Sequence, residues 1–222
     1  GSFFFSGLLT PLFSEVSDGT LITIERTCWW LHIAGIFAFL NYLPYSKHLH
    51  IILAFPNAYY ARLELPGKMK NMPAVQNEVR YAVQPETAPA NAPPPDRFGA
   101  KDIFDLSWKN LLDAYSCTEC GRCTVACPAN LTGKLLSPRK IMMATRDRVE
   151  AIGKNINLNK QFVDDGKSLL HNYISVEELR ACTTCNACVE ACPVSISPLD
   201  IITELRRSLI MEESNAPQEW NS

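Results

Sequence analysis

The stretches "CTECGRCTVACP" (residues 117–128) and "CTTCNACVEACP" (residues 182–193) are two near-copies of one motif that begin 65 residues apart. Both follow the frame C-T-x-C-x-x-C-x-x-A-C-P, which holds eight of the nine cysteines of the chain. The spacing of cysteines says more than their number. Three thiols separated by two residues each can lie on one tight loop, and the fourth begins the next segment. The two runs therefore predict a metal-binding domain.

The spacing C-x2-C-x2-C-x3-C-P is the ligand run of bacterial ferredoxins with two [4Fe–4S] clusters, in which the fourth cysteine ligates the other cluster. By this rule we expect one cluster on Cys117, Cys120, Cys123 and Cys192. We expect the second cluster on Cys182, Cys185, Cys188 and Cys127. Two clusters that exchange ligands must be close neighbours, so the motif predicts a path for single electrons.

Structural zinc and disulfides are the alternatives to iron–sulfur clusters. Zinc also uses C-x2-C pairs, but two complete four-cysteine runs with trailing prolines are not the usual arrangement of zinc knuckles. Disulfides are disfavoured because thiols stay reduced on the cytoplasmic side, where we expect this domain. The net charge of −2 favours no polyanionic partner, so we expect no nucleic acid to bind.

Residues 128–181, between the two runs, form a longer segment than a minimal two-cluster ferredoxin has. The domain resembles instead the helical ferredoxin domains of the C subunit of heterodisulfide reductase and of the iron–sulfur subunit of succinate dehydrogenase. It lacks the C-x4-C-x2-C run of the latter and the paired-cysteine "CCG" domain that carries disulfide chemistry in the former family. The resemblance implies an electron-transfer subunit whose catalytic step belongs to a soluble redox partner, such as a subunit of the CCG-domain type.

Helix signals surround the cysteine runs in a mainly α dicluster domain, which we expect over residues 100–211. Ser137-Pro138 and Ser197-Pro198 each resemble an N-cap followed by proline at the first helical position. The sequence "SVEE" at residues 175–178 is a capping box. A polar tail follows over residues 212–222.

A linker is expected over residues 66–99, because seven of the fifteen prolines fall between residues 66 and 97. Such a composition cannot build a core, and we predict that it is extended.

Residues 1–65 are predicted to be a membrane segment with a transmembrane helix. A helix over residues 30–59 would span about 44 Å, which is a bilayer with its headgroups. Trp29-Trp30 and Tyr59-Tyr60 resemble interfacial aromatic belts, and basic residues follow the second belt. The positive-inside rule then places the iron–sulfur domain on the cytoplasmic side of the inner membrane. The alternative is a long buried helix of a soluble protein.

His32 and His50 lie 18 residues apart, which is five whole helical turns, so both would face one side of a single helix about 27 Å apart. Such a pair cannot bind one metal ion, but it can ligate two haems, each completed by a histidine from another helix.

The stretch "LHIAGIFAFLNYLPYSKHLHI" (residues 31–51) resembles the last haem-binding helix of the nitrate reductase gamma subunit family and of its relatives in membrane heterodisulfide reductases. The shared frame is H-x11-P-[YF]-S-[KR]-x2-H, and it covers roughly residues 20–65. The resemblance implies that His32 and His50 are axial ligands of different b-type haems. It also implies that Lys47 pairs with a haem propionate, with lipid headgroups as the equal alternative. His48 is expected at the surface or at a quinone site.

In that family the partner histidines belong to earlier transmembrane helices, and no histidine precedes His32 here. We therefore expect residues 1–65 to be the end of a cytochrome b-like domain that contacts further cytochrome b-like helices and membrane lipid. The predicted function is electron transfer between a quinone (menaquinone or another), haem b and a soluble partner, through two [4Fe–4S] clusters. The alternatives are a membrane-tethered ferredoxin that acts as scaffold or redox sensor without haem, and the iron–sulfur subunit of a quinone-linked dehydrogenase.

Overall fold

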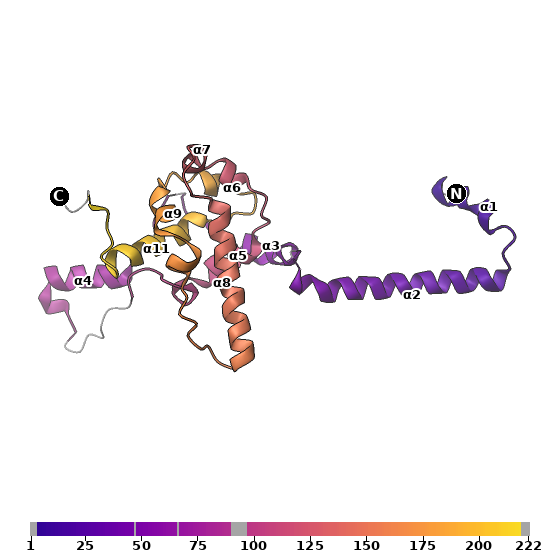
Figure 1. The fold of residues 1–222 in the computed structure, drawn as a ribbon, viewed down its shortest axis with the longest axis horizontal. Coiled ribbons are helices and arrows are strands. Elements are labelled where there is room, and N and C mark those ends of the chain that lie inside the picture. The colour runs from indigo at the N-terminus through magenta and orange to yellow at the C-terminus, as the bar shows by residue number, and fades with distance from the viewer. Residues whose placement is uncertain (1–3, 47, 66, 90–96, 219–222) are drawn as a thin grey trace. The chain divides into compact units, whose positions relative to one another are not determined.

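The computed structural model describes residues 4–46, 48–65, 67–89 and 97–218, and over these residues the chain is mainly helical and contains no strand (Figure 1). The chain divides into two units, Gly1–Leu49 and His50–Ser222, and each is described by itself.

The first unit contains α1 (Phe4–Phe13), α2 (Asp18–Tyr42) and the 3₁₀ turn η1 (Leu43–Tyr45). Helix α2 has no buried residue, and it carries Glu25, Arg26 and His32 among its apolar residues. Among the described residues, none of the helices combines the length and the apolar character that crossing a bilayer requires.

The prediction of one continuous helix over residues 30–59 is wrong. Helix α2 ends at Tyr42, and α3 (Leu49–Tyr59) begins only after η1 and the extended Ser46, whose φ and ψ are −113° and 163°. Pro44 explains this break, because proline lacks the N–H that a helix needs and its ring clashes with the carbonyl four residues earlier. Consequently, His32 and His50 do not lie on one face of one helix.

The prediction of an extended linker over residues 66–99 is wrong in part. This range contains helix α4 (Pro73–Val83) and the 3₁₀ turn η2 (Pro85–Thr87). Pro73 stands in the first turn of α4, where a missing N–H costs nothing, and no other proline interrupts the eleven residues of the helix. Residues 90–96 of the linker lie outside the described residues.

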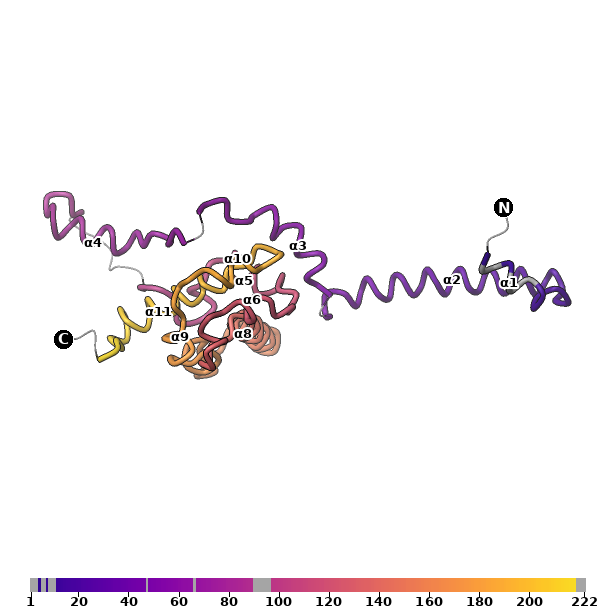
Figure 2. Tube along the Cα trace, turned by 90° about the horizontal axis from the view of Figure 1, so that it is seen from above, coloured from indigo at the N-terminus to yellow at the C-terminus, as the bar shows by residue number. Residues whose placement is uncertain are grey.

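The second unit is built around the long helix α8 (Pro138–Asn159), which packs against α5 (Trp108–Ser116), α11 (Pro198–Met211) and the short helical segment η4 (Leu169–Tyr173) (Figure 1). Its smaller elements are η3 (Ile103–Asp105), α6 (Arg122–Val125), α7 (Pro128–Leu131), α9 (Val176–Ala181) and α10 (Ala187–Glu190). The two short helices that follow the cysteine loops, α6 and α10, lie side by side (Figure 2).

The helix caps expected from the sequence are confirmed. The hydroxyl oxygens of Ser137 and Ser197 accept the backbone N–H of Lys140 and Asp200, and each serine precedes a proline at the first helical position. Ser175 and Glu178 form the reciprocal capping box of α9. The apolar core beneath these helices includes the fully buried Leu136, Ile141, Leu169, Leu170, Ile174, Leu179, Ile201, Ile202 and Leu205.

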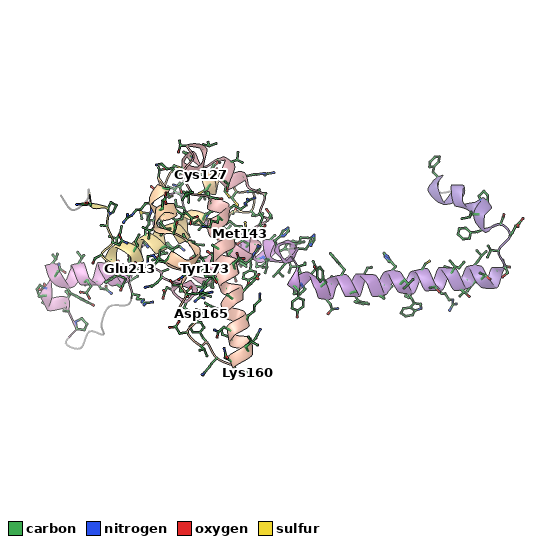
Figure 3. All side chains as sticks on the ribbon, viewed as in Figure 1. Cys127, Met143, Lys160, Asp165, Tyr173 and Glu213 are labelled. Carbon is green, nitrogen blue, oxygen red and sulfur yellow. The ribbon has the colours of Figure 1, made fainter. Side chains whose placement is uncertain are left out.

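A fully buried arginine ties α8 to the loops beside it. The Arg148 guanidinium forms ion pairs with Asp102 at 2.7 Å and with Asp165 at 2.6 Å. It also lies 5.8 Å from the ring centroid of Tyr173, and Figure 3 shows Asp165 and Tyr173 beside α8. A charge can be buried only when it is paired and hydrogen-bonded. Arg148 therefore fixes the loops that contain Asp102 and Asp165 against α8.

Candidate metal centres

The eight cysteines of the two runs lie around two neighbouring hollows. The cysteines that line the first hollow are Cys117, Cys120, Cys123, Cys188 and Cys192. Those that line the second are Cys127, Cys182, Cys185 and Cys188. Cys188 lines both, so the two hollows share a wall. Figure 3 labels Cys127 close to the segment that holds α6 and α7.

Each hollow takes its fourth cysteine from the other run. Cys192 lies with the first three cysteines of residues 117–128, and Cys127 lies with those of residues 182–193. These are the two groups named from the sequence, and ligation itself stays a prediction.

The two cysteine loops repeat one backbone conformation. Glu119 and Thr184, each one residue before the second cysteine of its run, both have φ of 56°. Gly121 and Asn186, each one residue after that cysteine, have φ of 79° and 61°. Residues other than glycine rarely adopt such a conformation, and where they do it often belongs to a ligand site. Here the left-handed residues wrap each loop around its hollow.

The wrapped backbone donates hydrogen bonds to the thiols. The N–H of Thr184 lies 3.4 Å from Cys182 Sγ, and the N–H of Ile196 lies 3.4 Å from Cys192 Sγ. Such donors stabilise negative charge on sulfur, and they tune the potential of a cluster when one is bound.

Partial or full burial shifts the pKa values of four thiols upward. Burial raises the pKa of Cys117, Cys123 and Cys182, and it raises the pKa of Cys188 to about 12 with help from the neighbouring thiols. In contrast, a hydrogen bond from the backbone of Arg122 lowers the pKa of the exposed Cys120. A thiolate is the form that binds metal, so metal must displace protons from the buried thiols.

The donor set fits [4Fe–4S] clusters, because such a cluster takes four thiolates and each hollow is lined by at least four cysteines. The remaining walls include apolar side chains such as Met142 and Val194 in the first hollow and Leu136 and Ile202 in the second. Among the residues that the structure describes, no three Cys, His, Asp or Glu side chains converge closely enough for a single metal ion.

Two arginines beside the cysteine loops were missed by the sequence reasoning. Arg146 of α8 lies 2.6 Å from the carboxylate of Glu119 in the first loop. Arg206 of α11 donates to the carbonyl oxygens of Leu179, at 2.9 Å, and of Cys182. Each arginine is the ninth residue after the serine of a Ser-Pro cap, so this repeat is the signal that identifies them.

Helix α3 is docked beside the first hollow. The side-chain amide of the fully buried Asn57 donates to the carbonyl oxygen of Val194 at 2.8 Å and accepts from Lys109 at 2.9 Å. The hydroxyl of Ser116 lies 3.4 Å from the carbonyl oxygen of Leu53. Ser116 precedes Cys117 and Val194 follows Cys192, so α3 contacts the chain next to two cysteines of this hollow.

A segment after α3, residues 62–65 and 67–70, contacts α11. Arg62 and Lys70 both form ion pairs with Asp200, at 3.0 and 3.3 Å, and Arg207 donates to the carbonyl oxygen of Lys70 at 2.6 Å. Residues of this segment line a pocket together with Asn186 and Cys192, among others. The segment therefore lies close to one cysteine of the first hollow.

The histidines predicted as haem ligands are not brought together by one helix. His32 is exposed on α2 of the first unit, and His50 is half-buried on α3 in the second unit. The ring of His48 contacts that of Phe39, with 6.3 Å between their centroids. Lys47 lies outside the described residues.

Comparison with known proteins agrees with this geometry. The family described as "4Fe-4S dicluster domain" matches residues 116–196. Over 91% of the chain there is 32% identity to a probable iron-sulfur-binding oxidoreductase, FadF, of Bacillus subtilis, and 30% of that protein is covered. Over 97% of the chain there is 30% identity to an EtfAB:quinone oxidoreductase of Syntrophomonas wolfei, again covering 30% of that protein.

A third relative supports the resemblance of the C-terminal domain. The C subunit of a ferredoxin/F(420)H(2)-dependent CoB-CoM heterodisulfide reductase from Methanosarcina acetivorans is 31% identical over 54% of the chain and 60% of its own length. No solved structure matches the chain. The chain spans less than a third of the first two relatives. Residues 116–196 therefore match the 4Fe-4S dicluster domain family, and the chain as a whole is similar to iron–sulfur oxidoreductases.

Proposed function

We propose that this chain is the electron-transfer part of a membrane-bound, quinone-linked oxidoreductase. In this proposal, electrons pass singly through two [4Fe–4S] clusters between the membrane side and a soluble redox partner. The observation that carries the proposal is the pair of adjoining hollows, which share Cys188 and exchange their fourth cysteines. Neighbouring one-electron centres suit electron transfer, and the catalytic step is assigned to a partner.

Each hollow would hold one cluster. Cys117, Cys120, Cys123 and Cys192 would ligate the first cluster, and Cys127, Cys182, Cys185 and Cys188 the second. When bound, the clusters supply one-electron oxidation and reduction. The protein's own contribution is to separate the thiols, to direct backbone N–H groups at sulfur and to exclude water with the apolar walls.

The docking of α3 supports an order for the two clusters. Asn57 and Leu53 of α3 contact Val194 and Ser116, which lie close to Cys192 and Cys117 in the chain, so the first cluster would be the one next to α3. The second cluster, whose cysteines these contacts do not adjoin, would then exchange electrons with the soluble partner. Two relatives are C subunits of heterodisulfide reductases, which supports a partner that is itself a redox protein.

The membrane, haem and quinone parts of the proposal are supported by the sequence of the N-terminal segment and by the names of similar proteins. His32 and His50 stand in the histidine frame of a haem-binding cytochrome family, and the proposal retains them as haem b ligands with histidines from other helices. The name EtfAB:quinone oxidoreductase supports a quinone as the membrane substrate. The proposed location is the inner membrane, with the dicluster domain on the cytoplasmic side.

The test uses the complete protein with its clusters, embedded in phosphatidylglycerol vesicles. The clusters are reduced with stoichiometric dithionite, menaquinone-4 is added, and EPR spectra of frozen samples follow the clusters. The proposal expects about eight irons per chain, an interaction spectrum of two reduced clusters, and reoxidation by the quinone. Clusters that stay reduced would exclude the quinone part, and zinc in place of iron would overturn the whole proposal.

A further inference from the structure

The dicluster domain repeats one further residue besides its cysteines. Helices α8 and α11 both begin with a Ser-Pro cap, and both carry an arginine nine residues after the capping serine. These residues, Arg146 and Arg206, each contact the cysteine loop that precedes their own helix. The two contacts differ in the charge of the accepting group, which is a carboxylate for Arg146 and neutral carbonyl oxygens for Arg206.

Arg146 meets a carboxylate. Its guanidinium lies 2.6 Å from Glu119 Oε1, and about a fifth of each side chain is exposed, 20% and 21% respectively. Glu119 stands between Cys117 and Cys120 in the left-handed conformation that wraps the first loop. The positive charge of Arg146 is therefore offset by the negative charge of Glu119 at close range.

Arg206 meets only neutral groups. It donates from Nε to the carbonyl oxygen of Leu179 at 2.9 Å, and from Nη2 to the carbonyl oxygens of Leu179 and Cys182. Among the described residues, no carboxylate forms an ion pair with it. The cation therefore acts on a cysteine of the second hollow without a compensating anion.

Reduction of a cluster adds one negative charge, so a nearby cation stabilises the reduced form and raises the reduction potential. A half-buried cation without an ion-pair partner acts more strongly than an exposed one, which water and salt screen. Arg122 and Arg139 also line the first hollow, but both are exposed, so solvent and salt screen their charges.

We propose that Arg206 is a positioning residue that raises the reduction potential of the cluster on Cys127, Cys182, Cys185 and Cys188, while Glu119 offsets the effect of Arg146 on the other cluster. This inference rests on the proposed assignment of the two clusters. A purely structural role for Arg206 would be to cap the C-terminal end of α9, where Leu179 and Cys182 lie. Such a role predicts no change in potential while the cluster is bound.

The test is a redox titration of the purified protein with its clusters, followed by EPR, on R206Q, R206K, E119Q and the double variant E119Q/R146Q. R206Q is expected to shift one of the two reduction steps to lower potential, and R206K to leave that step near its original position. E119Q is expected to shift the other step to higher potential. The double variant E119Q/R146Q, which loses both charges of the pair, is expected to leave the potential of that same step nearly unchanged.

The proposal is overturned if R206Q leaves both steps in place, if R206K lowers the potential as far as R206Q does, or if R206Q and E119Q move the same step. A midpoint potential does not depend on how many molecules retain the cluster, so partial loss of iron leaves the measurement valid. If R206Q loses this cluster completely, the potentials of R206K and E119Q decide the question. Iron content and the number of EPR-active clusters are measured separately, so failure of the cluster assignment itself is distinguishable.

Discussion

Asn57 and Val194 are 137 residues apart in the chain, yet the side-chain amide of Asn57 donates a hydrogen bond of 2.8 Å to the carbonyl oxygen of Val194. Val194 is two residues beyond Cys192, and Asn57 is fully buried. A buried polar side chain with satisfied partners specifies one arrangement of the segments that it joins. The contact therefore fixes α3 against the cysteine site.

Replacing Asn57 by leucine, which has the same branched shape and the same number of side-chain heavy atoms but no polar group, should remove this contact. The variant N57L leaves the carbonyl of Val194 without its donor, which costs about 1–3 kcal/mol for a buried group. We expect a lower urea midpoint for loss of the visible cluster absorbance, and faster proteolysis within residues 62–72. The control is N159A, because Asn159 is exposed and bonds only within α8. Equal midpoints for N57L and N159A would contradict the prediction.

Serine variants test whether the two hollows exchange their fourth ligands. C117S and C192S should each remove the same cluster, so that each single variant and the double variant retain about four of about eight irons. The double variant C182S/C192S should lose both clusters. The measurement is iron content with acid-labile sulfide, and C28S, outside both runs, is the control. A double variant C117S/C192S that binds no iron would speak against the exchange.

The thiols of the cluster-free protein should react in an order set by their pKa values. The pKa of Cys120 is lowered, so this exposed thiol should be alkylated first by iodoacetamide at pH 7.5. The pKa of Cys188 is raised to about 12, so at pH 8 only about one molecule in ten thousand carries its thiolate. Cys188 should therefore react last.

The same shifts predict the pH dependence of cluster assembly. Because metal must replace the protons of the buried thiols, reconstitution with iron and sulfide should accelerate from pH 7 to pH 9. Mass spectrometry of the alkylated peptides measures the order in which the thiols react, and the return of cluster absorbance measures the rate of reconstitution. Equal labelling of Cys120 and Cys188 at neutral pH would show that these pKa shifts are absent.

Two glycines should respond to alanine with opposite signs. Gly99 has φ of 76°, and an added Cβ would lie 2.4 Å from the carbonyl oxygen of Glu204 and 2.5 Å from the backbone nitrogen of Ser208. These are backbone atoms of α11 that cannot shift cheaply, so G99A should be destabilising by at least about 1–2 kcal/mol. Gly153 lies within α8, and nothing lies near its added Cβ, so G153A should stabilise the protein by about 0.5–1 kcal/mol. Urea unfolding of both variants checks the pair, and a stable G99A would contradict it.

The features readable from the sequence were those encoded within a few residues. The serine caps at Ser137, Ser175 and Ser197 were predicted because a capping hydroxyl and the N–H that it accepts are three residues apart. These caps depend on local geometry, which tertiary packing does not override here. The grouping of Cys192 with Cys117 is different, because it joins distant segments, and it was predicted from the ligand run of two-cluster ferredoxins.

The features that were missed depend on contacts between distant segments or on a single dominant residue. The ion pairs of Arg148 join residues 17 and 46 positions away, and no local pattern marks this arginine as buried. Helix α4 was missed because the proline content was averaged over residues 66–97, although its eleven residues contain proline only at the start. The break at Pro44 was missed because the prediction relied on the length of the apolar stretch around it.

The crossed arrangement of Cys127 and Cys192 makes the domain indivisible. A cut anywhere in residues 128–181 would give two fragments, each with three cysteines for one hollow and a lone cysteine for the other. Neither fragment would have a complete set of donors, although each would contain an intact copy of the repeat. Either fragment alone is therefore expected to bind no complete cluster.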